Sequence, residues 1–422
     1  MVSIQKLVSI TTLGDVEISS GIHVLHGLPE DWIYIGWYHE FNYGSDEYGC
    51  TSLPNIFHHW LMKRADIEAG QLTHVNALGR ECTDFVGMET TYDPAKKILV
   101  IGGYRYTAGD QGYPKIAIID VSDPSSPRVL KELEHSQSFS SPRARPYYNP
   151  KHNILMIGVH PENRIYYDTF ENVLNASSID AIPNRLDGYD WISPVDEDRV
   201  LVANPSTGRN DVLDLTTMQT SPTDISGWFI VRAPNYVVAL YKTANNTIGV
   251  KFFNISDLSL AKDVDTGKSA PSNGEQLSLL AVGDKVVIFN NESLEIYVVD
   301  PVNGLEATFS LPEKCGWLDR FSDGVVICTH PFRGNGDIKE FLADVYYAVV
   351  VNGTKACIKD QAGNPVTNKT VYVSEPYGQQ CSRDVQKLYG LLKSVTQLTT
   401  DSEGCVDLSQ FVGKTVVIIV PP

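Results

Sequence analysis

Charged side chains recur at equivalent places in a repeated hairpin pattern, and these residues could carry chemistry. Two carboxylates such as Glu89 and Asp190 could serve as the acid and base of a glycosidase if the fold holds them at the right separation. Arginines at the same level could bind a ligand or neutralise the carboxylates. We favour neutralisation, in which the arginines and carboxylates pair with one another in a ring that lines a hydrated channel. The candidates are Glu89, Arg143, Arg145, Asp190, Arg232, Asp319 and Arg320.

A second candidate site is an aromatic and acidic segment near residue 40. Aromatic rings stack on the apolar faces of sugars, and carboxylates accept hydrogen bonds from sugar hydroxyls. The residues that could act this way are Tyr38, His39, Tyr43 and Tyr48. A long solvated loop without a ligand is an equally good interpretation.

Motifs of known catalytic or metal sites are missing from the sequence. It contains no P-loop, no G-x-S-x-G, no H-E-x-x-H and no EF-hand loop. His58 and His59 are adjacent, and adjacent residues of a strand point to opposite faces, so the two cannot ligate one metal. We therefore expect no metal and no cofactor, and a non-enzyme rather than an enzyme.

Cysteines and N-x-[ST] sequons bear on the compartment. None of the seven cysteines forms a C-x-x-C pair. Cys315 with Cys328, or Cys357 with Cys405, could form a disulfide, and buried free thiols are the alternative. The asparagines that could carry glycans are Asn175, Asn245, Asn254, Asn291, Asn352 and Asn368.

The overall composition limits the possible partners. A net charge of -17 disfavours nucleic acid and anionic membrane surfaces. No apolar run reaches the roughly 18 residues that span a bilayer, so we expect no membrane insertion. The first fifteen residues alternate apolar and polar types, and we expect no signal peptide in this chain.

The elements that must position these residues repeat along the chain. An apolar strand, an Asp or Asn turn and a second strand recur at 115–134, 247–265, 294–312 and, more loosely, 211–225. Such units bury their apolar faces only by stacking on one another. The sequence contains seven hairpins, and each is followed by a third and a fourth strand. The hairpins lie at 21–39, 85–105, 143–160, 189–205, 227–242, 276–291 and 316–331. This pattern predicts an all-β fold, a seven-bladed β-propeller.

The two ends of the repeat array predict how the ring closes. The last unit shows three strands, at 317–321, 324–329 and 343–351, and residues 4–11 resemble a fourth strand. Their pairing would remove two exposed sheet edges. We therefore expect a propeller over residues 1–351. A β-sandwich domain is expected over residues 352–422, with one helix inserted at 382–398.

Two segments resemble known families. The unit IAIIDVSDPSSPRVLKEL resembles the repeat of LVIVD-type β-propellers, which implies a fold and no chemistry. The tail, CIKDQAGNPVTNKTVYVS with TTDSEGCVDL, is similar to transthyretin-like or carboxypeptidase-regulatory-like sandwiches, which are accessory modules of extracellular proteins. In composition the chain resembles structural proteins of archaeal viruses.

Three functions are compatible with these observations. The first is a non-enzymatic binding or structural protein on a virion or cell surface, part of a larger assembly that recognises a glycan or protein through its propeller loops. The second is a carbohydrate hydrolase or lyase with carboxylates in the central channel. The third is an intracellular scaffold that binds peptides.

Overall fold

The computed structural model describes most of the 422-residue chain. The described residues are 10–12, 22–28, 32–39, 56–63, 66, 73–107, 111–272, 274–282, 284–310, 318–320, 325–329, 338–342, 355–358, 364–374, 379–382, 396–411 and 417–419. They form antiparallel sheets with very little helix. None of the helices in these ranges is long and apolar enough to cross a membrane.

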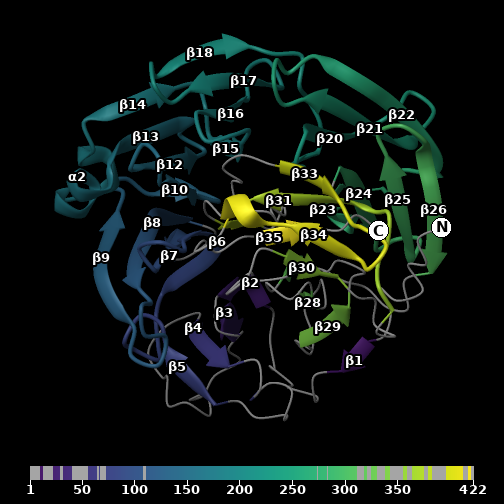
Figure 1. Ribbon diagram of the computed structural model, residues 1–422. Helices are drawn as coiled ribbons and strands as arrows, with labels where there is room; N and C mark the ends of the chain where they lie inside the picture. The colour runs from purple at the N-terminus through teal and green to yellow at the C-terminus, as the bar shows by residue number, and fades with distance from the viewer. Residues whose placement is uncertain are drawn as a thin grey trace.

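Seven antiparallel sheets stand in a ring and form the blades of a β-propeller (Figure 1). The first six blades each take four strands consecutively, beginning with the innermost. Blade 1 comprises β2 (Ile22–Leu28), β3 (Trp32–His39), β4 (Ile56–Lys63) and β5 (His74–Asn76); blade 2, β6 (Phe85–Asp93), β7 (Ile98–Tyr106), β8 (Gln111–Asp120) and β9 (Arg128–Glu134); blade 3, β11 (Arg143–Asn149), β12 (Ile154–His160), β13 (Arg164–Thr169) and β14 (Asn184–Asp187). Blade 4 comprises β15 (Trp191–Pro194), β16 (Arg199–Asn204), β17 (Arg209–Asp214) and β18 (Gln219–Pro222); blade 5, β19 (Phe229–Arg232), β20 (Tyr236–Lys242), β21 (Thr247–Asn254) and β22 (Leu260–Ser269); blade 6, β23 (Leu277–Val282), β24 (Lys285–Asn290), β25 (Glu295–Asp300) and β26 (Gly304–Ser310).

Blade 7 combines late residues with the N-terminal segment. It contains β27 (Leu318–Arg320), β28 (Val325–Thr329) and β29 (Ile338–Leu342), and β1 (Ile10–Thr12) pairs antiparallel with β29. The inner strands contact one another in a closed circuit, β2–β6–β11–β15–β19–β23–β27 and back to β2. The strand that pairs with β28 is 338–342, earlier than the 343–351 that the sequence predicts, and all of 343–351 lie outside the described residues.

The core lies between the blades, because each sheet packs both of its faces against neighbours. Along β19, Phe229 and Val231 pack with blade 6, whereas Ile230 between them packs with blade 4. Alternate residues of a strand point to opposite faces, so an inner strand must be apolar on both. This explains the nearly continuous apolar runs that define the repeat.

Asp residues end the third strands and shape the turns that follow. The Oδ1 atom of Asp120 accepts a hydrogen bond from the backbone N–H of Ser122 at 3.0 Å. Asp214 and Asp300 accept the N–H groups two residues ahead in the same way, at 2.8 Å each. A carboxylate that caps its own turn is the reason for the Asp that recurs in the repeat.

Short elements decorate blades 2 and 3. Strand β10 (Phe139–Ser140) pairs with β8 in blade 2. Helix α2 (Phe170–Asn175) and the 3-10 turn η2 (Ile179–Ala181) lie between β13 and β14, and the Thr169 hydroxyl caps α2. Another 3-10 turn, η3 (Gly274–Gln276), precedes β23.

The C-terminal segment forms two small sheets over the centre of the ring in the view of Figure 1. One pairs β30 (Lys355–Cys357) with β34 (Cys405–Asp407), and the other has the order β33–β31–β35. The bounds of the remaining elements are β31 (Thr370–Ser374), β32 (Gln379–Ser382), β33 (Thr396–Thr399), η4 (Ser409–Phe411) and β35 (Val417–Ile419). The helix predicted at 382–398 is wrong at its C-terminal end, since residues 396–398 belong to β33. Ser382, its expected N-cap, is the last residue of β32, and residues 383–395 lie outside the described residues.

Candidate functional site

Three of the predicted charged residues meet at the inner strands of blades 2, 3 and 4. The Nε atom of Arg145 on β11 donates to Glu89 Oε1 on β6 at 3.0 Å. Its Nη1 atom lies 3.5 Å from Asp190 Oδ2, just before β15. All three residues are buried. One guanidinium therefore joins two carboxylates from neighbouring blades.

Local backbone features bring these groups together. The pairing of β6 with β7 shifts register between Gly87 and Glu89, and such a β-bulge re-aims the side chains beside it. At Gly158 on β12, a Cβ atom would lie 2.3 Å from the carbonyl oxygen of Asp190. Only glycine lets the Asp190 backbone approach this closely.

Two further residues complete this arginine–carboxylate cluster. His160 Nδ1 lies 2.8 Å from Asp190 Oδ2, and the Arg145 Cζ atom lies 3.8 Å from the centre of the Trp191 ring. Stacking a guanidinium on an indole adds to the stabilisation of the ion pairs. Sequence reasoning missed both residues. His160 is the last residue of β12 and meets Asp190, thirty positions away, because β12 packs against the start of blade 4. No sequence motif marks such a contact.

The cluster is built for charge neutralisation. A retaining or inverting glycosidase needs one protonated carboxylic acid and one carboxylate that is open to the sugar or water. Here one buried arginine forms ion pairs with both Glu89 and Asp190, so neither carboxyl group stands free to serve as the acid or the base. Arg143 begins β11 at the same end of the strands and is half-buried.

Strand β32 occupies the inner edge of blade 2, next to this cluster. It pairs antiparallel with β6, and Ser382 lies opposite Glu89 in the register. It also contacts β2, the inner strand of blade 1. The C-terminal segment thus adds a strand to the propeller from the channel side, which the sequence analysis does not anticipate.

Arg232 is separated from the cluster. It is the last residue of β19, is buried, and its Nε atom donates to the Val195 carbonyl oxygen of blade 4 at 3.1 Å. Burial lowers the pKa of Arg232 to about 10, and the charges of Asp196 and Asp284 offset part of that decrease. The structure therefore does not bring all the predicted charges into one ring.

The other predicted residues are placed only in part. Asp319 and Arg320 lie on the inner strand β27, and Tyr38 and His39 end β3. Tyr43 and Tyr48 lie outside the described residues. The aromatic segment near residue 40 therefore remains a prediction.

His58 and His59 point to opposite faces of β4 and belong to different networks. His58 Nδ1 lies 2.8 Å from Glu81 Oε1, and His74 Nε2 lies 3.2 Å from Glu81 Oε2. Although partial burial raises the pKa of Glu81, hydrogen bonds from His58, His74 and Trp60 hold it well below its usual value. The Nδ1 atom of His59 meets the Tyr34 hydroxyl at 2.7 Å, on the other face.

Cysteines are joined in the C-terminal module. A disulfide links Cys357 to Cys405, across the paired strands β30 and β34. Cys82 in the propeller is disulfide-bonded as well. For Cys357 and Cys405 the alternative of free thiols is therefore excluded.

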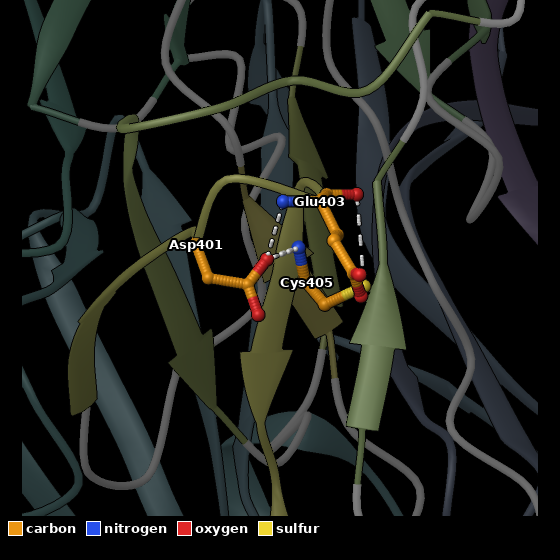
Figure 2. Close-up of side chains that lie close together, drawn as sticks. All are labelled: Asp401, Glu403 and Cys405. Atoms are coloured by element: carbon orange, nitrogen blue, oxygen red, sulfur yellow. Dashed lines mark hydrogen bonds between the residues drawn. The ribbon is translucent and has the colours of Figure 1, made fainter.

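One acidic group near this disulfide resembles a metal site in composition only. Asp401, Glu403 and Cys405 present ligand-type atoms within 4.8 Å of one another (Figure 2). The Cys405 sulfur is already bonded to Cys357, and Asp401 Oδ1 accepts the backbone N–H groups of Glu403 and Cys405 at 2.9 Å each. The arrangement is a capped turn, and it does not fit a metal ion.

The sequons differ in accessibility. Asn175, Asn245 and Asn368 are exposed, and Asn254 is half-buried. Asn291 is 1% exposed, so its side chain cannot carry a glycan in the folded chain, and the prediction for this residue is wrong. Asn352 lies outside the described residues.

Comparisons with known proteins agree with the ring. The LVIVD-repeat family matches residues 94–132, the second to fourth strands of blade 2. The structure of U3-55K is 12% identical, covers 79% of this chain and 98% of its own, and superposes with a TM-score of 0.51. The β-propeller domain of Cps50 (Swd1) from Myceliophteria thermophila is 12% identical (TM-score 0.44; 80% and 98% covered), and Sqt1 from Saccharomyces cerevisiae is 10% identical (0.42; 78% and 96%). A comparison with curated proteins finds no match. The protein is a repeat β-propeller, and the prediction of an all-β propeller fold is confirmed.

Proposed function

We propose that this propeller is a non-enzymatic binding or structural protein displayed on a virion or cell surface, where its loops recognise a glycan or a protein. The arrangement of Arg145 between Glu89 and Asp190 carries the non-enzymatic part of the proposal. The two carboxylates best placed for glycosidase chemistry share one buried arginine as ion-pair partner, so they link neighbouring blades of the ring.

Two observations support display in an oxidising compartment. Cys357 is joined to Cys405, and Cys82 is disulfide-bonded, whereas cytosolic proteins rarely keep such bonds. Three sequon asparagines, Asn175, Asn245 and Asn368, are exposed. These features also argue against the alternative of an intracellular peptide-binding scaffold.

The fold supports recognition by loops. Stacked blades form a rigid frame, and the loops that join their strands can vary without cost to the core. Strand β32 pairs with β6 and so covers the side of blade 2 that faces the channel. The loops that join the strands are therefore better placed than this side of blade 2 to meet a large partner.

A glycan array followed by product analysis tests this function on the full-length protein. We expect binding without any shortened or unsaturated product. The same assay on Glu89→Gln and Asp190→Asn, with the surface variant Arg209→Met as the matched control, asks whether the carboxylates act on a substrate. Product formed by the wild type and the control, and lost in a folded Glu89→Gln protein, would establish the hydrolase or lyase instead.

Intact-mass measurement on protein from its native source tests the display separately. We expect added hexose mass at one or more of the exposed sequons, and a mass increase on reduction that reports the disulfides. A chain with neither modification would favour the intracellular scaffold.

A further inference from the structure

Arg232 is a buried cation whose hydrogen-bonding capacity is mostly unused. Arg232 is 5% exposed, and among the described residues its one hydrogen bond runs from Nε to the carbonyl oxygen of Val195. The Nη1 atom is buried and has no hydrogen-bond partner. Within the described part of the chain, no carboxylate forms an ion pair with this guanidinium, and Asp196 and Asp284 act on it only through their charge.

The two acidic residues whose charges act on Arg232, Asp196 and Asp284, form hydrogen bonds with other residues. Asp196 Oδ2 accepts hydrogen bonds from Arg199 Nε at 2.8 Å and Arg199 Nη2 at 2.6 Å. Asp284 accepts from the backbone N–H of Asn235 at 3.0 Å and from its side-chain amide at 2.8 Å. Both carboxylates act on Arg232 only at longer range, which accounts for their effect on its pKa.

An unsatisfied buried guanidinium is costly, and a native structure has a reason to keep one. Removing such a charge from water costs several kcal/mol unless a counter-charge and hydrogen bonds replace the solvent. Unsatisfied buried polar groups mark places where an ion or water completes the structure. The planar fork of N–H donors matches the oxygens of carboxylates and phosphates.

We propose that Arg232 binds a small oxyanion between blades 4 and 5, at the turn end of their inner strands. The ligand is a carboxylate, phosphate or sulfate group, held by the guanidinium fork. Arg232 lies two residues after Ile230 on β19, so its side chain points to the same face of the strand, the face that packs against blade 4. The anion would therefore neutralise the arginine charge at the interface between blades 4 and 5. This site is independent of recognition by the loops, and its failure would leave the proposed function intact.

Thermal unfolding of the full-length protein in matched salts tests the site. Sodium phosphate, sulfate and acetate are each titrated against chloride at constant ionic strength, because sulfate and phosphate also stabilise proteins non-specifically. We expect the unfolding midpoint to rise and saturate for the wild type and for Arg209→Met, whose exposed guanidinium pairs with Asp224. In Arg232→Met the saturable part is lost. A preference for phosphate and sulfate identifies a tetrahedral oxyanion, whereas a preference for acetate identifies a carboxylate.

Arg232→Lys and calorimetry cover the case in which Arg232→Met does not fold. Lysine keeps the charge and loses the fork, so we expect isothermal titration with phosphate, or with acetate where that salt saturates first, to show affinity about tenfold weaker than the wild type. The proposal is wrong if the wild type shows no saturable response to any of the anions. It is equally wrong if Arg232→Met responds as the wild type does, or if Arg232→Lys binds as tightly as the wild type.

Discussion

Arg145 and Arg232 are buried to the same degree on inner strands, yet their surroundings differ. Arg145 is 7% exposed and lies between two carboxylates and an indole ring, whereas Arg232 is 5% exposed and meets a single carbonyl oxygen. Arg145 is near the start of β11, and Arg232 is the last residue of β19. Because the blades repeat one chain path, these positions belong to opposite ends of the channel. Equivalence in the repeat therefore does not predict equivalent chemistry.

The largest effect is expected from removing the paired arginine. Arg145→Met leaves Glu89 and Asp190 buried without their shared counter-charge, and breaking a buried pair in this way costs about 3–5 kcal/mol. Denaturant unfolding followed by circular dichroism measures the loss. Arg209→Met removes an exposed pair, and we expect it to change the free energy of unfolding by less than about 1 kcal/mol. Equal effects of the two variants would show that the cluster does not stabilise the ring.

A third buried base, His59, sharpens the comparison because it stays neutral. Burial lowers the pKa of His59 to about 4, below the 6.5 of an unfolded histidine. The unfolded chain therefore binds the extra proton between pH 6.5 and pH 4, so the free energy of unfolding falls as the pH falls through that range, by about 3 kcal/mol in total. Unfolding curves across the range measure this slope.

The matched variant for this prediction is His59→Asn. It removes the titrating group, so its stability should depend less on pH over the same window, although the lost contacts with Tyr34 and Phe85 lower its stability at every pH. A wild-type profile as flat as that of the variant would mean that His59 titrates normally in the folded chain.

The smallest effect on stability is expected at the unpaired arginine. In chloride alone, Arg232→Met removes a desolvated charge without orphaning a carboxylate, and we expect the free energy of unfolding to stay the same or rise by up to about 1 kcal/mol. The same unfolding measurement applies. If Arg232→Met lowered the free energy of unfolding as much as Arg145→Met does, Arg232 would be ion-paired in solution. The contrast between the arginines at the two ends of the channel would then not hold.

The ring itself could be predicted from the sequence because its causes are local. Apolar strands that pack on both faces, and aspartates such as Asp120 and Asp214 that cap the following turns, repeat with the blades. The proximity of Glu89, Arg145 and Asp190 followed from their equivalent places on, or directly before, inner strands. The sequence does not predict which of them pair, because the pairing depends on a bulge in β6. Nor does it predict that Arg232 lies apart from them, because this depends on where β19 ends.

Long-range pairing marks the limit of the sequence pattern. Strand β32 pairs with β6 across almost three hundred residues, and its four residues carry no periodicity that distinguishes them from the start of a helix. Apolar residues at helical spacing after Ser382 favoured a helix, but pairing with β6 decides the conformation of Ser382 itself. Tertiary contact overrides local preference there.

The pairing of β1 with β29 has a consequence for biosynthesis. The strand that completes blade 7 leaves the ribosome before the rest of the ring, and its partner, Ile338–Leu342, emerges more than three hundred residues later. Until then the nascent chain holds an incomplete arc with two open sheet edges, the kind of intermediate that invites chaperones or mispairing. The order of synthesis thus delays closure of the circle until β29 has emerged.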